Sequence, residues 1–146
     1  MSHPREDASS DDGFEPVHIE LDWYDGPRSG VADIDAAPHY FRAVNDSPRQ
    51  GENDEYFVWP AGQAALAGER ERWDVFVERF ERVNSGNAIP VSDIDRRHDE
   101  LTRRLEPHRT VPDGARRMKA EWRPRPTQTM PYHPDGPSYR AKWRPV

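Results

Sequence analysis

The sequence predicts an α+β domain, in which a curved, mostly antiparallel sheet of about six strands has two helices packed on one face. Two observations lead to this fold. Apolar residues alternate with polar ones in short segments toward both ends of the 146-residue chain, and they recur at three- and four-residue steps in its middle. The expected order is strand-strand-strand-strand-helix-helix-strand-strand. We expect residues 14–146 to form this single domain, behind a disordered acidic tail at residues 1–13.

The first expected strand has one apolar face, formed by Val17, Ile19, Leu21 and Trp23. The segment Asp25-Gly-Pro-Arg-Ser-Gly30 then has the composition of a turn, because glycine permits positive φ and proline fixes its own. A short strand over 31–35 follows. The returning strand covers 38–44, and a fourth strand over 55–59 stops at Pro60.

Helical spacing begins near Gln63, and a glycine-containing segment after Asn84 ends it. One apolar stripe runs along this helix, formed by Leu66, Trp73, Phe76, Val77, Phe80 and Val83. A second, shorter helix begins at Ser92 and is expected to end at about Glu106, because Pro107 follows. His98 lies beside the apolar residues of this second helix.

Two similar segments, Ala120-Glu-Trp-Arg-Pro124 and Ala141-Lys-Trp-Arg-Pro145, predict a final pair of strands. Each places its tryptophan on one face and basic residues on the other. The segment between them, residues 124–137, is rich in proline and is expected to be a stiff loop within the domain.

Charge is distributed unevenly along the chain. Residues 1–60 contain 14 acidic and 4 basic residues, whereas residues 111–146 contain 3 acidic and 8 basic residues. We expect the basic end to fold back against the acidic first strand, where Glu20 and Asp22 would pair with Arg140 and Arg144.

Composition excludes several classes of protein. The absence of cysteine excludes disulfides, thiolate zinc sites and a cysteine nucleophile. No stretch approaches the roughly 20 apolar residues of a membrane span, and the polar N-terminus lacks the apolar core of a secretory signal. No common catalytic or nucleotide-binding motif occurs, so we assign no catalytic residue, no metal and no cofactor.

Two alternatives remain open. A ligand-binding or metal-assisted hydrolytic site could form in the Asp22–His39 region from Asp25, Arg28, Asp33 and His39, although their spacing matches no named metal motif. The basic face of the last two strands could bind single-stranded nucleic acid, but the overall net charge of -6 disfavours this interpretation.

The segment Asp22-Trp-Tyr-Asp-Gly-Pro-Arg-Ser-Gly-Val-Ala-Asp33, followed by Pro38-His-Tyr-Phe41, resembles a group of uncharacterised small bacterial proteins. The resemblance covers residues 17–83. It implies a bacterial, cytosolic setting, and no activity or functional residue comes with it.

We therefore expect a non-enzymatic module that binds another protein, as an immunity-type or assembly partner does. The features that favour it are the polarised charge, the many aromatic residues and the proline-rich loop. The expected contact residues are Arg28, Tyr40, Arg123, Tyr132, Arg140, Lys142 and Arg144. Nucleic acid is a disfavoured partner, we expect no membrane partner, and the sequence specifies no oligomeric state.

Overall fold

The structure is a computed structural model that describes residues 13–23, 27–44, 54–84, 91–123, 137 and 139–146. Six antiparallel strands follow one another around a closed barrel, each paired with the next in the chain. The strands are β1 (Glu15–Trp23), β2 (Pro27–Ile34), β3 (Ala37–Ala43), β4 (Asp54–Pro60), β5 (Arg116–Arg123) and β6 (Arg140–Pro145). The order of strands and helices agrees with the sequence prediction.

The predicted open sheet is wrong, because the first and last strands pair with each other. Glu15 lies opposite Ala141, and Pro16 lies opposite Arg140, so the sheet has no free edge. Alternation of apolar residues indicates which side chains share a face of a strand, but it does not indicate which strands pair at the two edges. Closure protects both edges and encloses the aromatic side chains.

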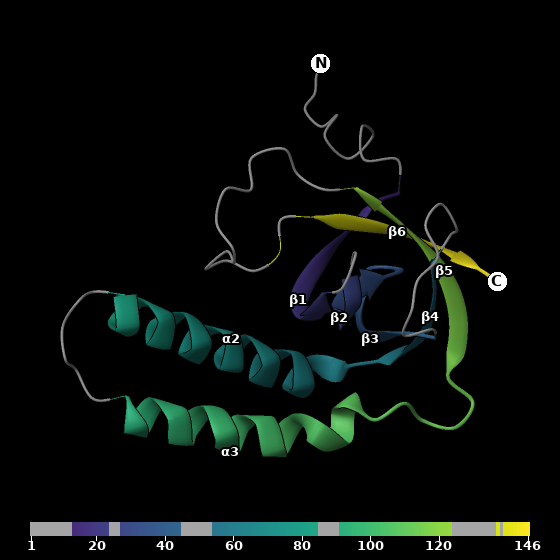
Figure 1. Ribbon diagram of the computed structural model, residues 1–146. Coiled ribbons are helices and arrows are strands. Elements are labelled where there is room, and N and C mark those ends of the chain that lie inside the picture. The colour runs from purple at the N-terminus through teal and green to yellow at the C-terminus, as the bar shows by residue number, and fades with distance from the viewer. Residues whose placement is uncertain (1–12, 24–26, 45–53, 85–90, 124–136, 138) are drawn as a thin grey trace.

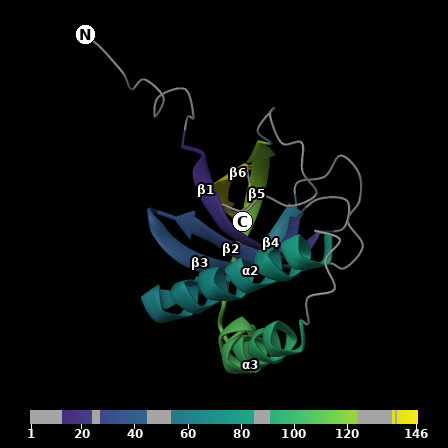
Figure 2. The same ribbon diagram turned by 90° about the vertical axis from the view of Figure 1, so that its left-hand side faces the viewer.

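Two helices form a hairpin between β4 and β5. Helix α2 (Gly62–Asn84) lies against the outside of the barrel at β1 and β3, and α3 (Ser92–Arg109) packs on α2. Figure 2 shows this layering, with the barrel on one side of α2 and α3 on the other. Figure 1 shows that the end of the hairpin projects beyond the barrel. The helices therefore cover the outside of a barrel and not the face of an open sheet.

The apolar core has two main parts. One fills the barrel, and its buried members are Val17, Ala32, Ile34, Phe41, Tyr56, Val58, Met118, Ala120, Tyr139 and Ala141, with Ala43, Trp122 and Trp143 packed against them. The other joins the outside of the barrel to the helices, with Ile19, Val31, Tyr40, Trp59, Ala61, Ala65 and Leu66 buried. The strands β1 to β4 thus contribute to a core on both sides.

A bulge in β1 changes which face its residues share. The pairing with β2 shifts register between Val17 and Ile19. Val17 therefore packs inside the barrel, whereas Ile19 and Leu21 pack on the helix side. The single apolar face predicted for this strand is wrong, because one extra residue reverses the alternation and both faces are covered.

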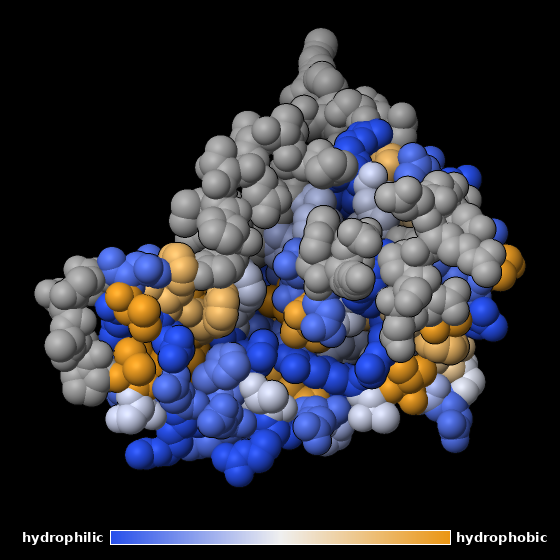
Figure 3. Space-filling model, viewed as in Figure 1, coloured by the Kyte–Doolittle hydropathy of each residue, from blue (hydrophilic) through white to orange (hydrophobic). Residues whose placement is uncertain are grey.

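The helices also differ from the prediction in two details. Pro107 lies inside α3, which continues to Arg109, because a proline in the last turn removes only one helical hydrogen bond. The apolar stripe of α2 is buried at Leu66 but ends at Val83, which is 55% exposed. Figure 3 shows apolar atoms at this projecting end of the hairpin.

Candidate functional site

A pocket of about 220 Å³ lies where the outer face of β1–β3 meets the two helices. We call it the arginine cleft. It is lined by Leu21, Asp22, Ser29, Tyr40, Phe41, Arg42, Trp59, Arg72 and Arg109. Three of these residues are arginines, one from each of β3, α2 and α3, so the cleft exists only in the folded chain.

Behind the lining of the cleft lies Glu69, whose fully buried side chain binds two of the lining residues, Arg109 and Tyr40. Arg109 donates hydrogen bonds from Nε to Oε2 at 2.8 Å and from Nη2 to Oε1 at 2.7 Å. Tyr40 donates its hydroxyl to Oε2 at 2.8 Å. Burial, and then the negative charge of Glu69, raise the pKa of Tyr40, so its hydroxyl remains a donor at neutral pH. Glu69 is thus satisfied by three donors and neutralised by Arg109.

Arg72 contributes a second positive charge to the lining of the cleft. Its Nε donates to the hydroxyl of Thr102 at 2.8 Å, which orients the guanidinium. Burial lowers the pKa of Arg72, and the nearby charge of Arg109 lowers it further, whereas the charge of Glu69 opposes this change. No carboxylate of the described residues forms an ion pair with Arg72. Such a half-buried guanidinium favours an anion beside it.

Aromatic residues form the apolar part of the cleft. The rings of Tyr40 and Trp59 stack with centroids 5.6 Å apart and planes inclined by 19°. The Trp59 indole N–H donates to the carbonyl oxygen of His108 at 2.9 Å, which connects β4 to the last turn of α3. Both rings are therefore held rigidly beside the arginines, and this arrangement can receive a flat apolar group next to a negative charge.

The rim of the cleft contains one residue of each charge. Arg42 and Asp22 are both exposed, and Ser29 donates its hydroxyl to Asp22 at 3.0 Å. These two opposite charges balance each other in number and are screened by solvent. Counted over the lining residues that the structure describes, the surplus positive charge of the cleft therefore comes from Arg72.

The structure places the expected contact residues in different environments. Tyr40 lies in the arginine cleft, but it is buried and bonded to Glu69. Arg28 is also buried, at 9% exposed, near the start of β2, where the pairing with β1 shifts register. Tyr132 lies outside the described residues.

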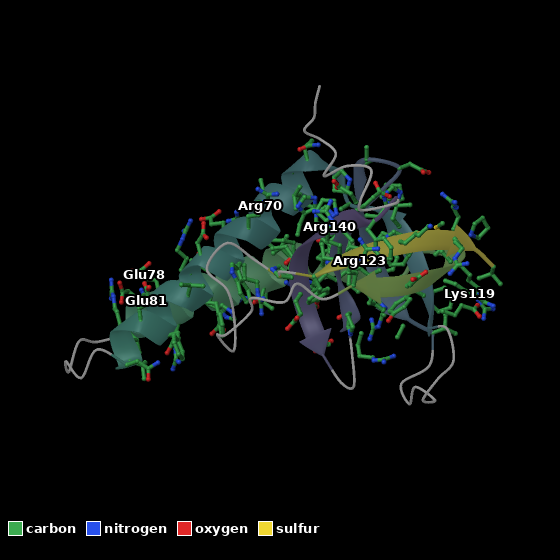
Figure 4. The ribbon with its side chains drawn as sticks, turned by 90° about the horizontal axis from the view of Figure 1, so that it is seen from above. Arg70, Glu78, Glu81, Lys119, Arg123 and Arg140 are labelled. Carbon is green, nitrogen blue, oxygen red and sulfur yellow. The ribbon has the colours of Figure 1, made fainter. Side chains whose placement is uncertain are left out.

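The basic residues of the last two strands gather partly around Phe14. The guanidinium of Arg123 lies 4.0 Å from the centre of the Phe14 ring, and the ammonium of Lys142 lies 6.0 Å from it. Arg140 donates to the Phe14 carbonyl oxygen at 3.3 Å. Figure 4 shows Arg123 and Arg140 close together, with Lys119 near the far end of the strands. These cations therefore do not form one continuous row.

The ion pairs expected between the first strand and the basic end are replaced by other bonds. Arg144 pairs with Glu121 at 3.1 Å, and Asp22 accepts from Ser29. Glu20 accepts a hydrogen bond from the hydroxyl of Tyr139 at 2.8 Å. The two ends of the chain are nevertheless adjacent, through the pairing of β1 with β6.

The residues of the alternative ligand site in the Asp22–His39 region do not form one cluster. Arg28 is buried near the start of β2, whereas Asp33, near its end, accepts from His18 at 2.8 Å, and Arg70 contacts the second ring nitrogen of His18 at 3.0 Å. The His39 ring contacts the carbonyl oxygen of Ala37 at 2.8 Å, and Asp25 lies outside the described residues. Among the residues that the structure describes, no three His, Asp or Glu side chains gather to hold a metal ion.

Sequence reasoning missed Glu69, Arg72 and Arg109. One signal was available for Glu69, which follows Leu66 by three positions and precedes Trp73 by four, on the apolar stripe of the helix. A charged residue at such a position needs a buried partner. The partner itself, 40 residues along the chain, has no local signal.

Comparisons of the chain with protein-family models, with curated proteins and with solved structures found no match. Within the described residues, no helix has the length and apolar character needed to cross a bilayer.

Proposed function

We propose that the chain is a non-enzymatic module that binds another protein and that the arginine cleft receives an acidic segment of that partner. The observation that supports it is the half-buried Arg72, which is oriented by Thr102 and has no carboxylate partner among the described residues. A positive charge held in a partly desolvated position is favourable when a partner supplies the opposite charge.

The chemistry of the cleft agrees better with binding than with catalysis. The two bonds from Arg109 and the one from Tyr40 occupy Glu69, so its carboxylate is committed to the structure. A general base must reach the proton that it removes, and Glu69 is fully buried. What the cleft offers to a ligand is a guanidinium group and two aromatic rings. The bacterial cytosolic setting is part of the proposal and comes from the sequence resemblance.

The test is a quantitative capture experiment with the full chain. Wild type, Arg72→Gln and Arg103→Gln are immobilised, and proteins retained from an extract of the encoding organism are measured by mass spectrometry. Arg103 is the matched control, because it is an exposed arginine on α3 that does not line the cleft. A candidate partner is then purified, and its dissociation constant is measured with each variant.

We expect a partner that binds wild type and Arg103→Gln equally and binds Arg72→Gln at least tenfold more weakly. Equal binding of all three variants would place the interface elsewhere and overturn the assignment of the cleft. The absence of any stoichiometric partner would overturn the protein-binding function itself.

A further inference from the structure

The balance of charge in the arginine cleft indicates what kind of acidic group fits it, and this step rests on the proposed function. Arg109 is neutralised by Glu69 through two hydrogen bonds. Arg42 and Asp22 add one charge of each sign at the exposed rim. Among the described residues, Arg72 is left as a single surplus positive charge. A ligand with one negative charge would neutralise the cleft, whereas a ligand with two would leave one charge uncompensated.

The shape of the Arg72 guanidinium group also favours a ligand with a single carboxylate. Thr102 accepts the Nε–H of Arg72, and Thr102 in turn donates its hydroxyl to the carbonyl oxygen of His98 at 2.8 Å. Thr102 therefore holds the planar group in one orientation. A planar guanidinium group with its terminal N–H groups available matches the two oxygens of a carboxylate.

The apolar lining determines the rest of the ligand. Leu21 and the stacked rings of Tyr40 and Trp59 border the same pocket as the three arginines. Its volume of about 220 Å³ accommodates more than a carboxylate alone, because one water molecule occupies about 30 Å³ in the liquid. The remaining volume is suited to a ring or a short aliphatic group.

We infer that the arginine cleft binds one carboxylate attached to an aromatic or aliphatic group, presented by the partner protein as an acidic residue beside an apolar one. Arg72 binds the carboxylate, and the Tyr40–Trp59 stack contacts the apolar group. Glu69 does not touch the ligand. It is a positioning residue that holds Arg109 and Tyr40 in place.

The test uses three small probes that share a benzyl group and differ in charge: phenylacetate, phenylacetamide and benzylphosphonate. Binding to the full chain at pH 8 is followed by NMR, through the indole N–H signal of Trp59 and the Nε–H signal of Arg72. The probes are compared on wild type, Arg72→Gln, Arg72→Lys and Arg103→Gln, after thermal unfolding has shown that each variant is folded.

We expect phenylacetate to bind wild type at least tenfold more tightly than either other probe. The Arg72→Gln variant should lose the preference for phenylacetate over phenylacetamide, and Arg72→Lys should keep part of it, because the charge remains. The Arg103→Gln variant should behave as wild type. Equal binding of phenylacetate and phenylacetamide to wild type, or tighter binding of benzylphosphonate, would overturn the inference.

Failure of the proposed function gives a different result. If phenylacetate binds through Arg72 but no protein partner does, the ligand chemistry stands and its source is a free small acid. If a protein partner depends on Arg72 but phenylacetate does not bind or compete with it, the inference about the ligand is overturned and the binding function stands.

Discussion

Arg109 donates two hydrogen bonds to the buried carboxylate of Glu69, from Nε at 2.8 Å and from Nη2 at 2.7 Å. The pair joins the last turn of α3 to the buried side of α2, and Tyr40 extends the same network to β3. The hydrogen bonds of Glu69 therefore both hold the helices against the barrel and position residues that line the arginine cleft. Burial lowers the pKa of Arg109, but the hydrogen bonds and the charge of Glu69 outweigh burial and raise it overall.

Replacing Arg109 alone should be strongly destabilising. The change Arg109→Met leaves the charge of Glu69 buried, with Tyr40 as its one remaining hydrogen-bond donor among the described residues, and we expect a loss of about 3 kcal/mol in the free energy of unfolding. The double variant Glu69→Gln with Arg109→Met should recover more than half of this loss, because no buried charge is left unpaired. Urea denaturation measures both values. A double variant no more stable than Arg109→Met would contradict a coupled pair.

Two glycines provide a matched pair of packing tests. A Cβ atom at Gly30 would collide with the backbone oxygen of Ile19, beside the irregular pairing of β1 with β2. A Cβ atom at Gly68 would meet the end of the Leu105 side chain at 3.0 Å. We expect Gly30→Ala to cost about 3 kcal/mol or more, because backbone must move. Gly68→Ala should change the stability by less than about 1 kcal/mol, since alanine favours the helix and the leucine can shift.

Thermal and urea unfolding of the two alanine variants decide this comparison. Similar stabilities for both would mean that β1 and β2 are less closely paired at Gly30 than described.

His98 should make stability depend on pH in the mildly acidic range. Burial, and then the positive charge of Arg72, lower the pKa of His98 below its ordinary value of 6.5, although Asp95 and Asp99 oppose this change. Between the lowered pKa and 6.5 the unfolded chain binds more protons than the folded chain, so the free energy of unfolding falls as pH falls through this range. Above 6.5 the contribution of His98 is constant.

The measurement is urea denaturation of wild type, His98→Gln and His108→Gln between pH 7.5 and pH 5. His108 is exposed on the same helix and serves as the control. The decline with falling pH should be shallower in His98→Gln than in wild type and unchanged in His108→Gln. Equal slopes in all three would mean that His98 titrates alike in the folded and unfolded chains.

The sequence predicts the strands and helices of this fold better than the closure of the sheet into a barrel. The alternation of Met118, Ala120 and Trp122 correctly indicates the face that packs inside the barrel. Helix α2 begins and ends within one residue of its expected limits, because apolar periodicity and the glycine-containing segment after it are local signals. The uneven charge predicts that the two ends of the chain lie together, but no local pattern encodes the pairing of β1 with β6 that closes the barrel.

The site was less predictable than the fold. Tyr40 was identified as a contact residue and does lie in the arginine cleft, but it binds Glu69 inside the protein. Arg72 and Arg109 resemble the other arginines of a chain with 21 basic residues. What distinguishes them is burial and the number of carboxylates nearby, and both properties arise only when the two helices pack against the barrel.

The tryptophans of the barrel and of the cleft should respond differently to replacement by phenylalanine. The Nε1 atoms of Trp122 and Trp143 are buried and have no hydrogen-bond acceptor among the described residues. Their rings pack against Phe41 and Tyr56, with centroids 5.5 to 5.8 Å apart. A buried N–H without an acceptor costs about 1–3 kcal/mol, which offsets part of what the larger ring contributes.

We therefore expect Trp143→Phe to change the free energy of unfolding by less than about 1 kcal/mol, because the lost ring area is compensated by removal of the unsatisfied donor. Trp59→Phe should cost about 2 kcal/mol more, because it breaks the bond to His108 and leaves that carbonyl oxygen without the indole donor. Urea denaturation of both variants measures the difference. Equal losses would mean that the Trp143 indole N–H has an acceptor inside the barrel, and the barrel interior would then contain a polar group or a bound water molecule that stabilises it.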